Sequence, residues 1–172
     1  MLNTFPRKHS STRSKQVYFP SMLLDSSFIE CKLVDLPVIK HFPASSEEEW
    51  RTFKHFGLRS ADAYILVYDV NMSSSFQFIQ NIREQISSTR ALHDTPIVIA
   101  ANKTDLGKDD PKQDIAATVR RTWRASYVEC SAKYNWNISN IFKEVAREVI
   151  KQREKESKEK EEDIRQCCSP FR

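Results

Sequence analysis

The sequence predicts an α/β protein with a doubly wound, mostly parallel sheet, and two observations support this prediction. First, residues 63–68 and 96–101 are uninterrupted apolar runs, the pattern of strands that are buried on both faces. Second, the segment between them places Phe76, Ile79 and Ile82 at helical spacing. Strands that alternate with helices form parallel sheets, whose ligands bind beyond the carboxyl ends of the strands.

The chain is expected to begin with a disordered polar segment, residues 1–14, followed by a β-hairpin. Residues 15–24 and 28–36 contain the apolar residues of two strands. Residues 25–27 (Asp-Ser-Ser) are typical of the turn between them.

A short helix is predicted after the hairpin. Ser45 and Ser46 provide an N-cap, and the acidic residues 47–49 follow in the first turn, where they interact favourably with the helix dipole. Gly57 is expected to end this helix. The residues of the helix that we expect to face the core are Trp50, Phe53 and Phe56.

The rest of the domain is predicted to alternate between strands and helices. Asp69 closes the first buried strand, and residues 73–75 are expected to cap the next helix. Pro111 is expected to open a helix that reaches Trp123, and residues 127–130 are predicted to form a short strand.

The last predicted helix starts near Trp136 and has two parts. The first part has an apolar stripe that docks on the sheet, formed by Ile138, Ile141, Phe142, Val145, Val149 and Ile150. Residues 151–165 lack this stripe and contain six basic and six acidic residues, which can form i, i+4 pairs in water. We therefore predict a domain over residues 15–150, followed by a charged helical extension and a cysteine-containing tail over residues 151–172.

Length and charge exclude several classes of function. The chain has 172 residues, enough for one domain with a sizeable core, and a net charge of +4. The basic excess lies in the first 24 residues, which hold four basic residues and no acid, so no basic face remains for a nucleic acid. This acid-free start also resembles a mitochondrial presequence, which is an alternative to the polar lead-in.

The cysteines favour a cytoplasmic protein. The four of them show neither the spacing of a zinc site nor that of a disulfide framework, which favours a reducing compartment. No run approaches the ~18 consecutive apolar residues of a membrane span. Cys167 and Cys168 leave two alternatives open: palmitoylation with peripheral contact at the plasma membrane, or two unmodified thiols. Prenylation is not expected, because Ser169 occupies the fourth position from the end.

Polar residues follow three of the predicted strands. Asp35 ends the second strand of the hairpin, residues 102–105 (Asn-Lys-Thr-Asp) follow the second buried strand, and residues 131–133 (Ser-Ala-Lys) follow the last strand. Asn-Lys-x-Asp alone is a common pattern, but its combination with Ser-Ala-Lys at the end of the next strand is specific. This combination resembles the Ras superfamily of small GTPases, which implies a P-loop NTPase-like fold of the Ras type.

The resemblance implies a site for guanine. Guanine presents two neighbouring donors, N1–H and an exocyclic amine, and a single carboxylate can accept from both. This is the role implied for Asp105, which Ser131 would orient. Adenine has no donor at N1, and sites built to hydrogen-bond a group reject analogues that lack it.

Four further residues complete the implied site. Lys103 and Lys133 would cover the two faces of the base with their methylene stems. Asn102 would tie its loop to the neighbouring loops, and the backbone N–H of Ala132 would meet guanine O6. The alternative is that Asn102 and Asp105 only form a capped turn.

The resemblance extends over about residues 15–150 and is greatest to the Ras-like protein family 10 branch, on residues 57–69, residues 127–136 and Asp35-Leu-Pro-Val. It implies GTP, GDP and Mg²⁺ as ligands and effector or regulator proteins as partners. Asp35 matches a position that reaches Mg²⁺ through water. Val38 stands where Ras relatives have glycine, and no catalytic glutamine follows, so weak GTP hydrolysis is expected.

The phosphate-binding loop of such proteins is missing from the sequence. That loop requires Gly-x-x-x-x-Gly-Lys followed by Ser or Thr, whereas the two glycines here are Gly57 and Gly107. Only 34 residues precede Asp35, and the hairpin occupies most of them. We therefore expect the fold to lack the first strand, the P-loop and the first helix.

In the Ras arrangement the first strand lies between the strand that ends at Asp35 and the strand over residues 63–70. Without it, the two flanking strands lose a shared partner. Three alternatives follow: the two strands pair with each other, residues 1–14 enter between them, or the chain is an incomplete product of a longer gene, which we favour.

The sequence thus predicts a Ras-like guanine-nucleotide-binding switch that is incomplete or impaired in nucleotide binding and hydrolysis. The alternative is a non-enzymatic, Ras-like scaffold whose hairpin, residues 15–24, pairs with a partner protein by strand addition. An unrelated α/β enzyme is not favoured, because the four histidines show no ligand spacing.

Overall fold

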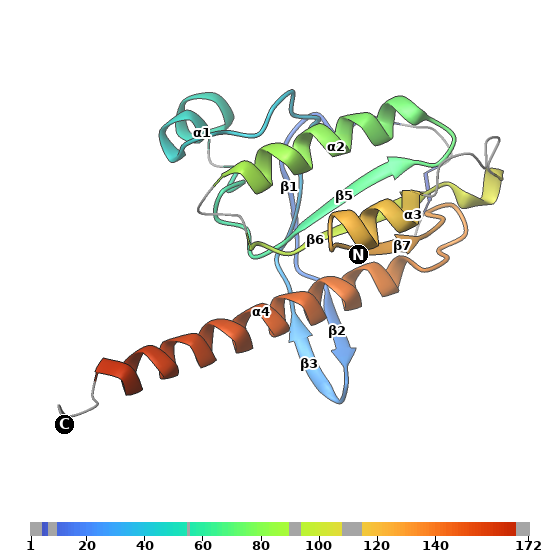
Figure 1. Cartoon of the computed structure of the whole chain (residues 1–172). Coiled ribbons are helices and arrows are strands. Elements are labelled where there is room, and N and C mark those ends of the chain that lie inside the picture. The colour runs from blue at the N-terminus through green and yellow to red at the C-terminus, as the bar shows by residue number, and fades with distance from the viewer. Residues whose placement is uncertain (1–4, 7–9, 55, 90–93, 108–114, 168–172) are drawn as a thin grey trace.

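The computed structural model describes residues 5–6, 10–54, 56–89, 94–107 and 115–167. The predicted disorder of residues 1–14 falls partly outside these ranges, as do the predicted helix start at Pro111 and Cys168. The described chain forms an α/β fold with a parallel sheet and a separate β-hairpin (Figure 1), which confirms the predicted fold class.

Three parallel strands form the centre of the molecule. They are β5 (Tyr64–Asp69), β6 (Ile97–Asn102) and β7 (Ser126–Glu129), in the order β5-β6-β7. Residues 98–101 of β6 are completely buried. This burial explains why the strand is apolar at every position rather than at alternate ones.

Helices cover both faces of the parallel sheet. On one face, Ile99 and Ala101 pack with Ile79 of α2 (Ser73–Ser88) and with Val119. On the other face, Val98 and Ala100 of β6 pack with Ile141 of α4 (Ile138–Cys167). The sheet is therefore doubly wound, as predicted.

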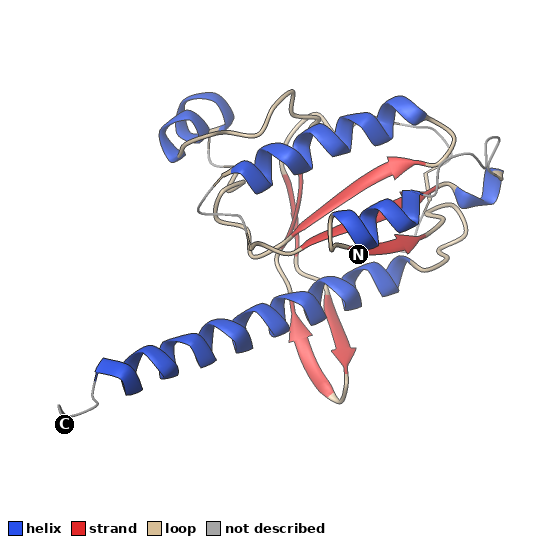
Figure 2. Ribbon diagram, viewed as in Figure 1, coloured by secondary structure: helices blue, strands red, loops and turns tan. Residues whose placement is uncertain are grey.

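The pairing of the two hairpin arms is interrupted once, so the hairpin consists of an inner and an outer ladder. The inner ladder pairs β1 (Gln16–Tyr18) with β4 (Leu33–Asp35), and the outer ladder pairs β2 (Ser21–Leu24) with β3 (Ser27–Glu30). The turn is tight because two residues, Asp25 and Ser26, adopt positive φ angles of 44° and 70°. The predicted hairpin is confirmed, and neither of its ladders is joined to the parallel sheet (Figure 2).

Helix α1 (Ser46–Phe53) begins as predicted and ends earlier than predicted. The Ser45 hydroxyl accepts the N–H of Glu48 at 3.1 Å. The helix ends at Lys54, which adopts φ 30°, and not at Gly57. The prediction that Trp50 faces the core is wrong, because this side chain is 63% exposed, whereas Phe53 is buried.

The cap predicted for α2 is also wrong. Its N-cap residue is Met72, which has no side-chain cap, and the Ser75 hydroxyl instead accepts the N–H of Asp69 at 3.0 Å. After residues 108–114 the chain continues as α3 (Ile115–Ala117) and a π-helical turn, η3 (Thr118–Thr122). Helix α4 then runs far beyond the sheet (Figure 1), and almost every residue of its segment 151–162 is exposed.

Candidate functional site

The polar residues predicted to form the guanine site lie at the carboxyl ends of two of the parallel strands, β6 and β7. The register of the sheet places Asp69 of β5 beside Asn102 of β6, and Ala101 beside Glu129 of β7. The loops that leave β6 and β7 therefore start side by side. This shared starting point explains how residues about 30 positions apart in the sequence come into contact.

Asp105 and Ser131 are joined directly. Asp105 lies in a short 3₁₀ helix, η2 (Thr104–Leu106), and its Oδ1 accepts the Ser131 hydroxyl at 2.6 Å. Ser131 is only 2% exposed, and its Oγ also accepts the N–H of Tyr134 at 3.3 Å. Because the serine is held by both contacts, it fixes the orientation of a carboxylate that remains exposed to solvent.

Asn102 connects the two loops through its side chain. Its Oδ1 accepts the backbone N–H of Ala132 at 3.0 Å. Thr104 adds a second link, because its hydroxyl donates to the carbonyl of Cys130 at 2.9 Å. The N–H of Ala132 is therefore engaged by Asn102, and guanine O6 would have to share or replace this bond.

Lys133 lies on a tight turn that the residues after β7 form. Ser131 and Trp136 exchange two backbone hydrogen bonds of 3.1 and 2.9 Å across this turn. The Lys133 ammonium lies 4.9 Å from the centre of the exposed Tyr134 ring. The turn thus presents a lysine stem and an aromatic ring to solvent beside Ser131.

Lys103 has a partner that the sequence analysis did not include in the site. Its Nζ lies 2.7 Å from Oδ2 of Asp69. Burial acts to raise the pKa of Asp69, but the hydrogen bonds from Lys103 and from the N–H of Asn71 outweigh burial and lower it. Asp69 could have been found from the sequence, because it is the polar residue that ends a predicted buried strand. That strand lies directly beside the strand that precedes Lys103.

Asp35, the residue expected to reach Mg²⁺ through water, lies away from the parallel sheet. Asp35 lies on the hairpin, where its carboxylate accepts the hydroxyl of Thr12 at 3.1 Å. The described residues contain no group of three histidine, cysteine or acidic side chains that could hold a metal ion. The two glycines lie fifty residues apart, at positions 57 and 107. Asp35 thus lies on a hairpin that no ladder of the described strands joins to the parallel sheet.

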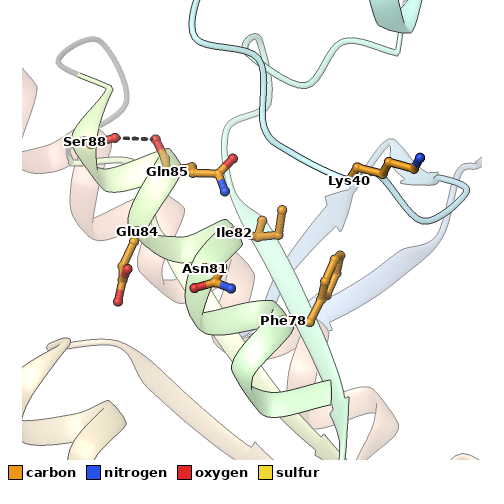
Figure 3. A pocket seen from close by; sticks show the side chains of 7 residues that line it. All are labelled: Lys40, Phe78, Asn81, Ile82, Glu84, Gln85 and Ser88. Atoms are coloured by element: carbon orange, nitrogen blue, oxygen red, sulfur yellow. Dashed lines mark hydrogen bonds between the residues drawn. The ribbon is translucent and has the colours of Figure 1, made fainter. Parts of the chain in front are cut away.

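One hollow of the described surface lies beside α2. It has a volume of about 360 Å³ and lies between Lys40 and the outer side of α2, with Phe78 and Ile82 among its lining residues (Figure 3). None of the strand-end residues lines it. This hollow is therefore separate from the strand-end loops.

Comparison with known proteins agrees with this geometry. The sequence profile of the Ras family matches residues 1–151. Human Ras-like protein family member 10B is 39% identical over 153 residues, which cover 87% of this chain and 75% of the relative. Human Ras-like protein family member 10A is 36% identical over 154 residues, with 86% and 75% covered. Ras-like protein 2 of Mucor circinelloides f. lusitanicus is 28% identical over 156 residues, with 88% and 75% covered. The chain therefore belongs to the Ras family of small GTPases, in its Ras-like protein family 10 branch.

Proposed function

We propose that the chain is a guanine-nucleotide-binding switch whose base-reading loops are formed and whose hold on phosphate and Mg²⁺ is impaired. Members of the Ras family are GTP-binding switches, which gives the general role. The observation that supports base reading best is the 2.6 Å hydrogen bond from Ser131 to Asp105. It prepares an exposed carboxylate for a ligand that offers two neighbouring donors.

The proposed division of labour assigns selectivity to Asp105 and affinity to the lysines. Asp105 accepts from guanine N1–H and the exocyclic amine, charge-assisted bonds that are stronger than neutral ones. Lys103 and Lys133 cover the faces of the base with their stems. Asn102 fixes the two loops relative to each other through the N–H of Ala132, which guanine O6 then shares.

Weak binding of the phosphates follows from the same proposal. Without closely spaced glycines, backbone N–H groups cannot surround a phosphate. Asp35 is the proposed water-mediated ligand of Mg²⁺, and its neighbour Val38 is 84% exposed where a glycine would free a backbone N–H. We therefore expect negligible GTP hydrolysis by this chain.

Titration with mant-GDP and mant-GTP tests the proposal. We expect measurable binding that GDP displaces and ADP does not, and Asp105→Asn should weaken it about 10- to 100-fold, the contribution of hydrogen bonds to a charged group. Asp25→Asn, at the exposed hairpin turn, is the matched control and should leave binding unchanged. Equal affinity for GDP and ADP would contradict the proposed base site, and phosphate release above background would contradict the proposed impairment.

A second candidate function is a scaffold that binds partner proteins without nucleotide. The hairpin supports this candidate, because it exposes several large apolar side chains, of which the most exposed are Phe19 at 76%, Phe28 at 69% and Leu23 at 65%. An effector or regulator could add a strand to such an edge. Partner binding that is lost with Asp105→Asn favours the switch, and binding that is indifferent to this substitution favours the scaffold.

We propose a division into a nucleotide-binding body over residues 15–150 and a charged extension over residues 151–172. None of the described helices is long and apolar enough to cross a bilayer. We propose a cytoplasmic protein that reaches the plasma membrane peripherally when Cys167 and Cys168 are palmitoylated. Release of the acyl groups by hydroxylamine tests this, and a tail that carries no thioester in cells would contradict it.

A further inference from the structure

One contact at the strand ends has no role in the base site proposed above: the ion pair of Lys103 with Asp69. We infer that Asp69 is a positioning residue for nucleotide binding, which holds the Lys103 stem at the place where the base lies. This inference rests on the proposed function and adds a residue from a third strand to the same site.

Asp69 is itself held firmly. It is the last residue of β5, and its side chain is only 16% exposed. Its Oδ1 accepts the N–H of Asn71 at 2.9 Å, and its own N–H donates to the Ser75 hydroxyl at 3.0 Å. The remaining carboxylate oxygen, Oδ2, accepts from Lys103 at 2.7 Å. A carboxylate fixed in this way provides a defined endpoint for a long side chain.

Lys103 needs such an endpoint, because its side chain is 52% exposed. The residue adopts a left-handed conformation with φ 66°, at the point where the chain turns from β6 into η2. A lysine stem has many rotamers, and a ligand that orders it must oppose the entropy lost. The ion pair orders the stem before a nucleotide arrives.

The directions of two side chains define where the base would lie. Lys103 reaches toward Asp69 at the end of β5, and Asp105 reaches toward Ser131 after β7. The two residues are only two positions apart in the sequence, yet they are drawn to strands on opposite sides of β6. The proposed base fits between them, with its edge on Asp105 and its face on the Lys103 stem.

Asp69 and Asp105 should affect different properties of nucleotide binding. A methylene stem contacts the face of any purine, so loss of its anchor weakens guanine and hypoxanthine nucleotides alike. Asp105 recognises the exocyclic amine, which hypoxanthine lacks, so its loss removes the preference for guanine. If Asp69 had only a structural role, the equal weakening of guanine and hypoxanthine nucleotides would not need to depend on Lys103.

The experiment measures mant-GDP binding to the full chain, with GDP and IDP as competitors. Asp69→Asn keeps an oxygen for the N–H of Asn71 and removes the charge. We expect it to weaken both nucleotides about two- to tenfold, the effect of ordering one flexible side chain, and to leave the ratio of GDP to IDP affinity unchanged. Asp69→Glu, which keeps the charge, should recover part of the loss. Asp62→Asn, in an exposed ion pair with Arg153, is the matched control.

A double-mutant cycle separates positioning from a structural effect. Lys103→Met keeps a stem of similar length but cannot pair with Asp69, so Asp69→Asn should have no further effect in that background. Unchanged affinity in Asp69→Asn, or an undiminished effect of it beside Lys103→Met, overturns the inference and leaves the proposed function intact. Failure of the unmodified chain to bind mant-GDP contradicts the proposed function and, with it, this role. Should Asp69→Asn not fold, Lys103→Met must show the same two- to tenfold loss with an unchanged ratio, or the inference is wrong.

Discussion

The parallel sheet and the hairpin of this chain are built on different principles. In the sheet, β5, β6 and β7 pair residue by residue, and helices bury both faces. In the hairpin, the strands pair only with each other and expose large apolar side chains, such as Phe19 and Phe28. The two regions differ in burial, because helices cover both faces of the sheet, whereas the hairpin leaves large apolar side chains exposed.

This difference bears on where the predicted site residues lie. Asn102, Asp105 and Ser131 lie at strand ends whose positions the parallel register fixes. Asp35 ends a strand of the hairpin, and no ladder of the described strands connects that hairpin to the sheet. Precise placement of side chains thus follows the continuity of the backbone hydrogen bonds.

Substitution of one core residue in each region gives the largest expected contrast. Ile99→Ala in β6, where the side chain is fully buried, should lower the free energy of unfolding by about 2–5 kcal/mol. Leu23→Ala in the hairpin, where the side chain is 65% exposed, should change it by no more than about 0.5 kcal/mol. Urea denaturation measures both. Similar losses in the two variants would show that the hairpin belongs to the same core, contrary to this comparison.

The second largest effect is expected when the hydrogen bond between Ser131 and Asp105, which links the loops after β7 and β6, is removed. Ser131→Ala removes the donor to Asp105 and the acceptor for the N–H of Tyr134 at a position that is 2% exposed. We expect a loss of about 0.5–1.5 kcal/mol in the free energy of unfolding, the net contribution of a hydrogen bond, because Asp105 and Tyr134 are exposed and water can replace the lost partner. Binding of mant-GDP should weaken as well. Ser157→Ala on the exposed part of α4 is the control, and a loss in the control as large as in Ser131→Ala would contradict the linking role.

The sequence was sufficient to predict the parallel strands and the partners at their ends. Uninterrupted apolar runs identify strands that are buried on both faces, and the site residues follow directly at their ends. The pairing of Asp105 with Ser131 could be anticipated from the family resemblance, because both residues occupy motif positions. Helix positions were predicted less well, since Trp50 has the spacing of a core residue but faces solvent. Apolar spacing does not show which face has a neighbour.

Two polar contacts were not predictable for a related reason. The partner of Lys103 lies on a neighbouring strand, 34 residues earlier (103 − 69), and depends on the register between β5 and β6. The Ser75 hydroxyl was expected to cap α2, but it accepts the N–H of Asp69 instead. The contact of Lys103 depends on how far one strand is shifted along another, which local patterns do not encode. The contact of Ser75 is local, across the turn from β5 to α2, and takes the place of the cap that the same hydroxyl was expected to form.

Hydrogen exchange along β5 tests whether both edges of this strand are paired. The N–H of Tyr64 donates to Pro96 and that of Val70 to Asn102, so in this parallel ladder the even-numbered residues point toward β6. The amides of Ile65 and Val67 then point to the edge where β5 has no paired strand among those described. We expect them to exchange about tenfold faster than those of Leu66 and Tyr68, which corresponds to about 1.4 kcal/mol. Equal protection of all four amides would mean that a further strand pairs with this edge in solution.

Side chains rather than a ladder attach the loop after the hairpin to the sheet, and Tyr64 is the residue that tests this attachment. Its hydroxyl donates to the carbonyl of Leu58 at 2.5 Å, and its ring packs edge-on against Phe42 at 5.7 Å. Tyr64→Phe keeps the ring contact and removes the hydrogen bond, so we expect a loss of about 1 kcal/mol in thermal or urea unfolding.

The same tyrosine should make stability depend on alkaline pH. Burial, and then the negative charge of Glu49, raise the pKa of Tyr64 from 10.0 to about 12. Since the folded state holds this proton more tightly than the unfolded state, the contribution is complete below pH 10 and is lost as the pH rises through about 12. The stability of Tyr64→Phe should therefore decline less than that of the unmodified chain between about pH 10 and pH 12. Parallel declines in the two proteins would show that Tyr64 is already exposed to solvent, and that the loop after the hairpin is detached from the sheet.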